Sequence, residues 1–509
     1  MARENLGRIP GLVAAAALMV DYLTVVAVSV TAGVQAIVAF VPALDTHRVS
    51  ASVAGILLLM VVNLRGVREA GAIFVLPTYL FVGSLGALVV WGLLRVTVLG
   101  GVPQAVHAAP SAAVEVLTPF LVLHAFAGGC TAMTGIEAIA NGVPVFKRPE
   151  ARNAAATLST LAGILAVLFL GVTYLGQRVG AVPTAQANVV AQVGRAVADG
   201  PLFYLVQLSA AVVLLLAANT SFNGFPLLAA IIARDGYFPH QFTKRGQRLV
   251  YSNGIIVIGV LAIALVVVFR GSTHALIPLF AVGVFLCFTL SQAGMIQHWL
   301  RTRGPWWRLK LAVNGVGALA TGLATVVVVV AKFAAGAWLV VLLVPFLVMN
   351  FLAIHAHYQR TREELANVGP SPDPHDLRHR TLIPVHKLNR ATAEAVRYAL
   401  SASDSVIAVH IDDDGAETRQ LQHTWQAWCE HPPADRAVTL SRGDRPLVDY
   451  IQRVQAEEPR QPLTVMVPEV IPHHWWEEPL HNQSAFGLEL ALRYKDGIVV
   501  TTVPIRLHR

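Results

Sequence analysis

Residues 9–41 read IPGLVAAAALMVDYLTVVAVSVTAGVQAIVAFV, a run of 33 residues in which Asp21 is the only charged side chain. A helix crosses the hydrocarbon core of a bilayer with about 20 mostly apolar residues. The run is long enough to span a membrane and too long for the apolar region of a cleaved signal peptide. It therefore predicts a membrane helix near the N-terminus, entered from a short segment that carries Arg3 and Arg8.

Nine further stretches have the same character, which makes ten expected spans. The whole chain is 55% hydrophobic and 13% charged, with a mean hydropathy of +0.59, whereas soluble proteins carry charge on about 25% of their residues. This composition predicts an all-α polytopic membrane bundle. The nine stretches are 49–64, 71–97, 115–146, 152–177, 201–220, 251–270, 274–298, 306–332 and 335–356.

Charge is distributed unevenly along the chain. Residues 1–355 contain 21 Lys and Arg against 9 Asp and Glu, a net charge of +12, and residues 356–509 contain 17 against 21, a net charge of −4. With the N-terminus in the cytoplasm, 15 of those 21 basic residues fall in inner loops and 6 in outer loops. Basic loops stay on the cytoplasmic side, so we expect a multi-pass protein of the cell membrane with both termini in the cytoplasm.

A change of pattern marks a second domain. The segment ANVGPSPDPHD (366–376) is rich in proline and aspartate, which is typical of a linker. We expect a transmembrane domain over 1–356, a linker over 357–378 and a cytoplasmic α/β domain over 379–509. In the last of these, β-like runs at 381–385, 405–411, 437–441, 463–468 and 498–505 alternate with helical stretches. Such alternation predicts a mainly parallel sheet covered by helices.

Glu137 is the more informative of two carboxylates expected within the apolar spans. It lies in HAFAGGCTAMTGIEAIANGVP (124–144), where Gly128, Gly129 and Gly135 weaken the helix and predict a break near the middle of the span. Thr134 is three residues away and shares a helical face with Glu137. A carboxyl group kept from water there favours its protonated form, which suits proton coupling. Alternatively, a protonated Glu137 bonds to a neighbouring helix and the glycines serve close packing.

The first span holds the second polar group. Tyr22 and Ser29 are seven residues apart, two helical turns, so a phenol and a hydroxyl share one face. They could coordinate a cation or bond between helices. Asp21 must point elsewhere, toward a basic residue or an inner vestibule. Residues 219–221, Asn-Thr-Ser, are expected to end a span as an ordinary cap, with an ion-facing cluster as the alternative.

Other functional classes find no support in the sequence. No nucleophile and base pair, metal-ligand spacing, GxGxxG or Walker motif occurs in it. We therefore expect neither an enzyme nor a bound cofactor, no metal beyond a transported cation, and no nucleic-acid partner.

Four longer stretches resemble those of a known transporter family. They are RENLG with GLVAAAALMVDYLTVVAVSV (3–7 and 11–30), NLRGVREAG (63–71), AMTGIEAIANGVPVFKRPEARNAAATL (132–158) and AANTSFNGFPLLAAIIARDGYFPHQF (217–242). On these residues the chain resembles the amino acid–polyamine–organocation permeases and, within them, the KimA-type potassium–proton symporters. Its tail resembles the universal-stress-like domain of the same proteins.

The resemblance carries specific expectations. It implies a LeuT-type inverted-repeat fold, potassium import coupled to protons, a homodimer, and inhibition by cyclic di-AMP at the tail. By the same resemblance Tyr22, Ser29 and Thr134 would bind potassium and Glu137 would couple the proton. The family has two spans before the region that corresponds to residue 1, so we expect either a start codon placed too far downstream or a ten-span chain with an incomplete first repeat.

Two other functions remain open at this stage. The substrate could be an amino acid, as in the wider superfamily. The bundle could also anchor a ligand-sensing domain without moving any solute.

Overall fold

The computed structural model describes most of the chain as two compact units, residues 1–366 and 367–509. We treat each unit by itself. The described residues are 2–66, 71–99, 118–130, 139, 143, 146–182, 187–244, 246, 250–366, 379–403, 405–411, 415–428, 434–440, 446–459, 461–471 and 483–506.

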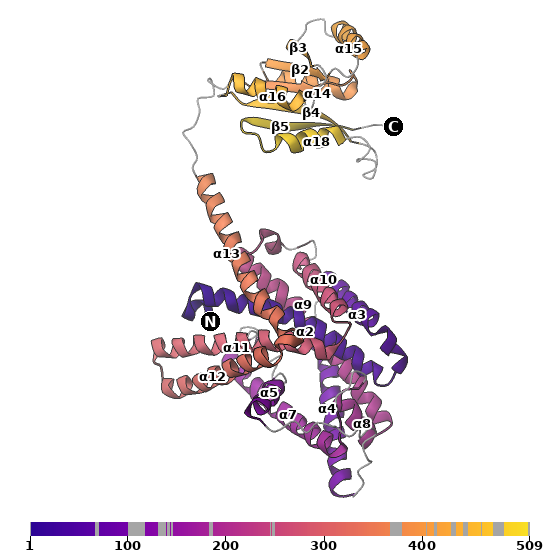
Figure 1. Cartoon of the computed structure of the whole chain (residues 1–509), viewed down its shortest axis with the longest axis vertical. Helices are drawn as coiled ribbons and strands as arrows, with labels where there is room; N and C mark the ends of the chain where they lie inside the picture. The colour runs from indigo at the N-terminus through magenta and orange to yellow at the C-terminus, as the bar shows by residue number, and fades with distance from the viewer. Residues whose placement is uncertain are drawn as a thin grey trace. The chain divides into compact units, whose positions relative to one another are not determined.

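The first unit is helical throughout its described part (Figure 1). Apart from the C-terminal ends of the helices over 201–234 and 338–366, its long helices begin and end close to the limits expected from hydropathy, because apolar composition fixes which residues can lie in lipid. The elements are α1 (Ala2–Leu6), α2 (Arg8–Val38), η1 (Pro42–His47), α3 (Arg48–Leu64), α4 (Gly71–Thr97), α5 (Pro119–Cys130), α7 (Glu150–Val179), α8 (Val189–Val197), α9 (Pro201–Arg234), η4 (His240–Thr243), α10 (Ser252–Val268), α11 (Thr273–Thr302), α12 (Trp307–Ala331), η5 (Phe333–Ala337) and α13 (Trp338–Ala366).

Eight helices in the described residues are long and apolar enough to cross a membrane, and α10 is a shorter apolar helix. The prediction of a mostly helical, multi-pass membrane protein is therefore confirmed. The remaining one of the ten expected spans, 115–146, is described mainly through α5. Its residues beyond Cys130 lie largely outside the described residues. Residues 357–366, which the sequence assigned to the linker, continue α13.

One expected helix end is wrong. The sequence suggested that a span ends at Asn219–Ser221, but α9 runs without interruption from Pro201 to Arg234. Asn219 and Ser221 are buried inside this helix, 6% and 1% exposed, and are not a cap. Three consecutive polar residues in an apolar run resemble the end of a helix. Here the two buried side chains pack against neighbouring helices, so the backbone hydrogen bonds of the helix continue.

Helix α2 occupies the middle of the unit and packs against α9, α11, α3, α10 and α13. Half of its most apolar 18-residue window is buried, whereas none of the corresponding window of α7 is. Peripheral helices instead expose large apolar side chains, such as Leu170 on α7 and Leu319 on α12, which are 66% and 74% exposed. A surface of this kind is suited to lipid and not to water.

The second unit is built on a five-stranded parallel sheet, as the alternating pattern predicted. Its strand order is β3-β2-β1-β4-β5 and every pair is parallel. The strands are β1 (Arg380–Pro384), β2 (Ser405–Ile411), β3 (Ala434–Leu440), β4 (Leu463–Ile471) and β5 (Ile498–Arg506), and the helices are α14 (Arg390–Ala402), α15 (Gly415–Trp428), α16 (Pro446–Glu457) and α18 (Gln483–Leu492).

Helices cover both faces of this sheet. Leu382 and Val465 pack with Ile451 of α16 and Leu492 of α18 in one core. The next residues along the strands point the other way and pack with α14 and α15. Side chains alternate between the faces of a strand, so a sheet that is apolar on both faces requires this double cover.

Close packing of α9 and α10 gives a stability test. A Cβ added to Gly254 of α10 would lie 2.8 Å from the Cα of Pro226 in α9, so backbone would have to move. We expect Gly254→Ala to destabilise the unit by about 1–3 kcal/mol through overpacking. Thermal unfolding of the detergent-solubilised full chain, followed by tryptophan fluorescence, measures this change.

The matched control is Gly315→Ala on α12, where an added Cβ meets nothing within 4 Å. This change should leave stability unchanged or raise it, because alanine is the better helix former. Equal melting temperatures for the two variants would contradict the packing of α10 on α9.

Candidate functional site

A row of buried polar side chains lies along α2. Asp21 and Thr24 are each 1% exposed, Ser29 is 8% and Thr31 is 2% exposed, while Tyr22 is half-buried. Polar groups are costly within a membrane-spanning bundle and mark solute pathways. This face of α2 is therefore the first place to look for a binding site.

Tyr22 lies directly against α9. A Cβ added to Gly224 would be 2.6 Å from Cζ of the Tyr22 ring and 2.9 Å from its hydroxyl oxygen. Only glycine, which lacks a side chain, leaves room for the phenol at this point. Tyr22 and Gly224 are about 200 residues apart in the sequence, and the fold brings them into contact.

Ser29 lies on the same stripe of α2. Two helical turns before Ser29, Tyr22 contacts Gly224 of α9. One turn after Ser29, a Cβ added to Gly33 would lie 3.4 Å from the carbonyl oxygen of Ala211 in α9. Residues three and four apart share a helical face, so Ser29 sits between these two contacts. Tyr22 therefore faces α9, and helix geometry places Ser29 on the same side of α2.

Asp21 faces another helix. A Cβ added to Gly283 of α11 would be 3.6 Å from Cβ of Asp21 and 3.4 Å from the carbonyl oxygen of Ala17. The carboxylate therefore lies at the interface of α2 and α11, about a quarter of a turn from Tyr22. The sequence left its direction open between a basic partner and an inner vestibule, and the fold places it against α11.

The two threonines of this row donate within α2 itself. Oγ1 of Thr24 lies 3.0 Å from the carbonyl oxygens of both Val20 and Asp21, and Oγ1 of Thr31 lies 2.8 Å from that of Ala27. These bonds satisfy the hydroxyl protons and leave the oxygen lone pairs as acceptors.

The glycine-rich segment is described only at its start. Gly128 and Gly129 lie in the last turn of α5. Thr134, Gly135 and Glu137 lie outside the described residues. The helix break and the proton-coupling carboxylate therefore stay predictions.

The sequence did not predict a further polar contact, a pair of asparagines that joins α3 to α9. Nδ2 of Asn63 in α3 donates to Oδ1 of Asn219 in α9 over 2.6 Å. Asn63 also donates to the Leu59 carbonyl oxygen, 2.8 Å away. In the sequence, Asn63 and Asn219 are each a side-chain amide within an apolar run. That pattern alone does not predict that the two amides form a hydrogen bond.

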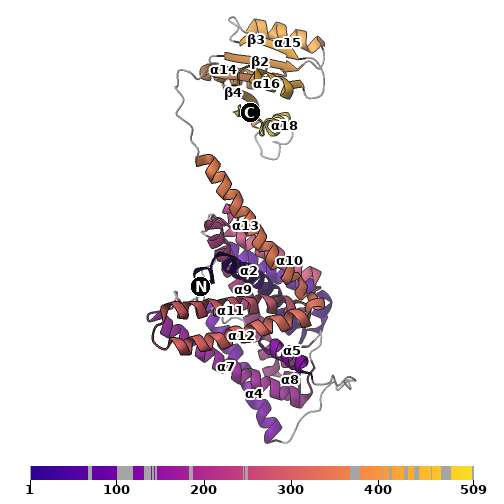
Figure 2. The ribbon, with the colours of Figure 1, turned by 60° about the vertical axis from the view of Figure 1, so that its left-hand side comes forward.

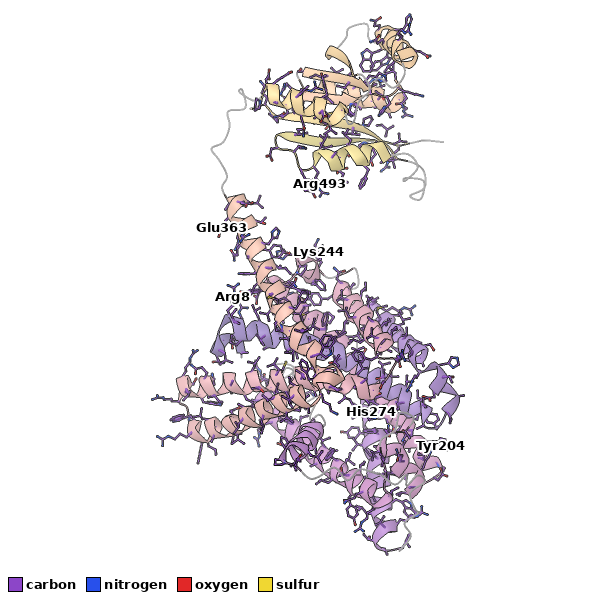
Figure 3. All side chains as sticks on the ribbon, viewed as in Figure 1. Arg8, Tyr204, Lys244, His274, Glu363 and Arg493 are labelled. Atoms are coloured by element: carbon purple, nitrogen blue, oxygen red, sulfur yellow. The ribbon has the colours of Figure 1, made fainter. Side chains whose placement is uncertain are left out.

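A polar pocket lies at the far end of α2. Its lining comes from α2, η1, the start of α3 and the start of α11, and it encloses about 350 Å³ when space open to solvent is included. Asp45 and Arg48 approach to 3.9 Å within it, and Thr273 donates to Thr31 over 3.4 Å at its wall. His274, labelled in Figure 3, also lines it. Polar side chains thus line most of this pocket, beside Thr31, the last buried hydroxyl of α2.

Comparisons with known proteins agree along the whole chain. Residues 1–356 match the family model described as amino acid permease, and residues 377–505 match the model described as the KimA potassium transporter C-terminal domain. The chain is 40% identical over 518 residues to a protein of Bacillus subtilis (strain 168) named potassium transporter KimA. That alignment covers 100% of this chain and 84% of the relative.

The contact between Tyr22 and Gly224 predicts a coupled pair of substitutions. Gly224→Ala should destabilise the protein by about 1–3 kcal/mol because the added Cβ overlaps the phenol ring. Gly224→Ala combined with Tyr22→Leu should regain part of that loss, giving a coupling energy of about 0.5–3 kcal/mol for residues in contact. Thermal unfolding of the two single variants and the double variant measures it.

Gly163→Ala on α7 is the control, since nothing lies within 4 Å of its added Cβ. Combined with Tyr22→Leu it should show additive effects. If the effects of Gly224→Ala and Tyr22→Leu on stability were also additive, the result would contradict the contact between Tyr22 and α9.

Proposed function

Because the chain belongs to the amino acid permease family and, within it, to the KimA-type potassium transporters, we propose that it imports potassium by secondary transport coupled to protons. The family consists of transport proteins, so the prediction that the chain is not an enzyme is confirmed. The B. subtilis relative carries the name of a potassium transporter, and the substrate assigned here extends that name to this chain.

One observation carries the proposal best: the buried stripe of Tyr22 and Ser29 on α2, closed on one side by α9. Hydroxyl and carbonyl oxygens are the ligands that replace the water shell of a potassium ion. Both side chains supply oxygen, and glycine at 224 leaves space at the phenol. We assign Tyr22, Ser29 and Thr134 to potassium and Glu137 to the proton.

Asp21 adds charge next to this stripe. Its Cβ lies near Gly283 on α11, and the residue is 1% exposed. A buried carboxylate close to a cation path lowers the free energy of the cation there. We propose that Asp21 contributes to the electrostatic field of the site while Tyr22 and Ser29 supply direct ligands.

The finer architecture is also proposed. We infer a LeuT-type inverted repeat for residues 1–356, a linker that begins only after α13 ends at Ala366, and a universal-stress-like domain over 379–509, with both termini in the cytoplasm. The inner loops hold the majority of basic residues. The strand order 3-2-1-4-5 with helices on both faces is the doubly wound arrangement that such a domain requires.

An amino acid is the second candidate substrate. The model that matches residues 1–356 is described as an amino acid permease. Amino acid binding in such bundles uses half-helix N-termini against the carboxylate. Direct uptake measurements decide between the two substrates.

We further propose that the tail binds cyclic di-AMP and that binding inhibits uptake in a homodimer. In doubly wound sheets, ligands bind beyond the carboxyl ends of the strands where the strand order reverses. Here that point lies between β1 and β4. The loop after β1 exposes Lys387 and Arg390 around the start of α14, whose cap is Asn389. Two cations at such an edge complement two phosphates.

Neutralising Glu137 tests proton coupling. In a strain that depends on added potassium, the full chain with Glu137→Gln should take up potassium about tenfold or more slowly, which corresponds to 1.4 kcal/mol of lost stabilisation. The remaining uptake should no longer vary with external pH. Rubidium uptake into proteoliposomes across a pH series measures both effects.

Glu150→Gln at the start of α7 is the matched control. Glu150 forms an exposed ion pair with Arg148 at 3.4 Å, and such pairs contribute little to stability, so wild-type rates and pH dependence are expected. Amino acid uptake without rubidium uptake would transfer the assignment to the second substrate, and no uptake of either would favour a membrane-anchored sensor.

Removing the two tail cations tests the regulatory ligand. Lys387→Gln with Arg390→Gln should weaken cyclic di-AMP binding to the full chain by about tenfold or more, since a hydrogen bond to a charged group contributes about 1.5–3 kcal/mol. Isothermal titration measures the affinity. Lys495→Gln is the control, because Lys495 precedes β5 and so lies at the amino-end edge of the sheet; equal losses in both variants would place the ligand elsewhere.

A further inference from the structure

The turn that joins α11 to α12 concentrates cations and tryptophans. Within residues 299–310, here called the Trp–Arg turn, four basic and three indole side chains occur in twelve positions. Figures 1 and 2 show α11 and α12 side by side, with their joined ends projecting from the rest of the unit. The seven residues are Trp299, Arg301, Arg303, Trp306, Trp307, Arg308 and Lys310.

In the part of the chain that the structure describes, none of these four cations forms an ion pair. The sequence contains no Asp or Glu between Asp235 and Glu363, a stretch that includes all of α10, α11 and α12. Among the described residues, the ion pairs involve other arginines, such as Arg3 with Asp235 and Arg380 with Glu458. Among the described residues, the positive charge of the Trp–Arg turn is therefore not neutralised by a carboxylate.

Tryptophan rings contact three of the four cations. The Cζ atoms of Arg303 and Arg308 lie 5.8 and 5.5 Å from the centre of the Trp307 ring, and Nζ of Lys310 lies 4.5 Å from that of Trp299. Cation–π contacts at these distances are attractive. They orient the charges while leaving the side chains of Arg303, Arg308 and Lys310 exposed.

The backbone of the turn holds Trp306 outward. Arg303 and Trp306 have positive φ angles of 39° and 62°, a region that non-glycine residues enter uncommonly and at a cost. The Trp306 side chain is 77% exposed. An exposed indole next to guanidinium groups is the arrangement that tryptophan adopts at a membrane interface.

An exposed apolar stripe leads away from the turn along α12. Its members are spaced three or four residues apart and so lie on one helical face. The stripe is long enough for an acyl chain, since α12 rises about 1.5 Å per residue. It consists of Leu309, Val313, Val316, Leu319 and Leu323, which are 59%, 64%, 69%, 74% and 44% exposed.

We propose that the Trp–Arg turn binds the headgroup of an anionic phospholipid whose acyl chain lies along the α12 stripe. Cations at one end of an apolar stripe complement both parts of such a lipid, whereas a free phosphate would use the cations alone. The turn also falls among the basic loops assigned to the inner face, where anionic headgroups attract clusters of Lys and Arg.

Lipid binding at the turn bears on the site through α11. This helix carries the turn at its C-terminal end and packs on α2 at Gly283, beside Asp21. An occupied turn restrains the end of the helix that closes one side of the buried polar row. The proposal concerns lipid recognition and holds for any transported solute.

Native mass spectrometry of the purified full chain tests the site. Phosphatidylglycerol is added against phosphatidylcholine with the same acyl chains, and bound lipids are counted as concentration rises. We expect selective retention of phosphatidylglycerol. Arg303→Gln with Arg308→Gln should weaken it about thirtyfold, at about tenfold per 1.4 kcal/mol and about 1 kcal/mol per cation.

Lys244→Gln with Arg360→Gln is the matched control, because it removes two exposed cations from other inner-face segments. Lys244 is labelled in Figure 3, well away from the joined ends of α11 and α12. This variant should keep wild-type affinity at the Trp–Arg turn. An equal loss in both double variants would overturn the proposal in favour of general surface charge.

Two further measurements distinguish binding of a lipid from binding of a free anion. Val316→Ser with Leu319→Ser leaves every cation in place and should weaken phosphatidylglycerol binding several-fold. Inorganic phosphate at millimolar concentration should not displace the lipid. Displacement by phosphate, or full affinity in the stripe variant, would overturn the lipid assignment. Thermal unfolding of each variant establishes that it is folded before its affinity is compared.

Discussion

Close approach of α2 to α9 and α11 is the contact on which the rest of the membrane unit depends. Glycines make it possible at three levels: Gly224 against Tyr22, Gly33 against the Ala211 carbonyl, and Gly283 against Ala17 and Asp21. In lipid, helices gain nothing from burying apolar side chains against each other, because the tails are equally apolar. Backbone contact through small residues supplies the van der Waals attraction instead, and it fixes α2 in the centre.

That central position explains where polar groups are tolerated. Asp21, Thr24 and Ser29 face protein on all sides and are at most 8% exposed, while the outer helices turn apolar side chains to the surface. A helix with the same polar residues at the periphery would expose them to hydrocarbon, at high cost. The same packing that stabilises the bundle therefore also keeps the hydroxyl and carboxylate groups of α2 away from lipid.

Sequence periodicity predicted the elements better than their contacts. Runs of apolar residues predict the membrane helices, and the alternation of strand and helix patterns predicts the parallel sheet. Both predictions therefore followed from local sequence patterns. The spacing of Tyr22 and Ser29 gave their shared face, but nothing local revealed that α9 supplies Gly224 opposite the phenol. The end of a span expected at Asn219 was wrong for the same reason: its partner, Asn63, is 156 residues away. Contacts between distant residues decide whether a polar residue ends a helix or joins two.

The end of the unit that holds the start of α2 is also linked to α13. Arg8, at the start of α2 (Figure 3), lies 5.1 Å over the Tyr237 ring, and Tyr237 stacks on His355 of α13 at 4.1 Å. One turn farther, His240 stacks on Tyr358 at 4.3 Å. The segment after α9 is thus held between the helix with the buried polar row and the helix that leads into the second unit. Because α13 is the covalent route between the units, these aromatic contacts join the start of α2 to the helix that leads into the second unit.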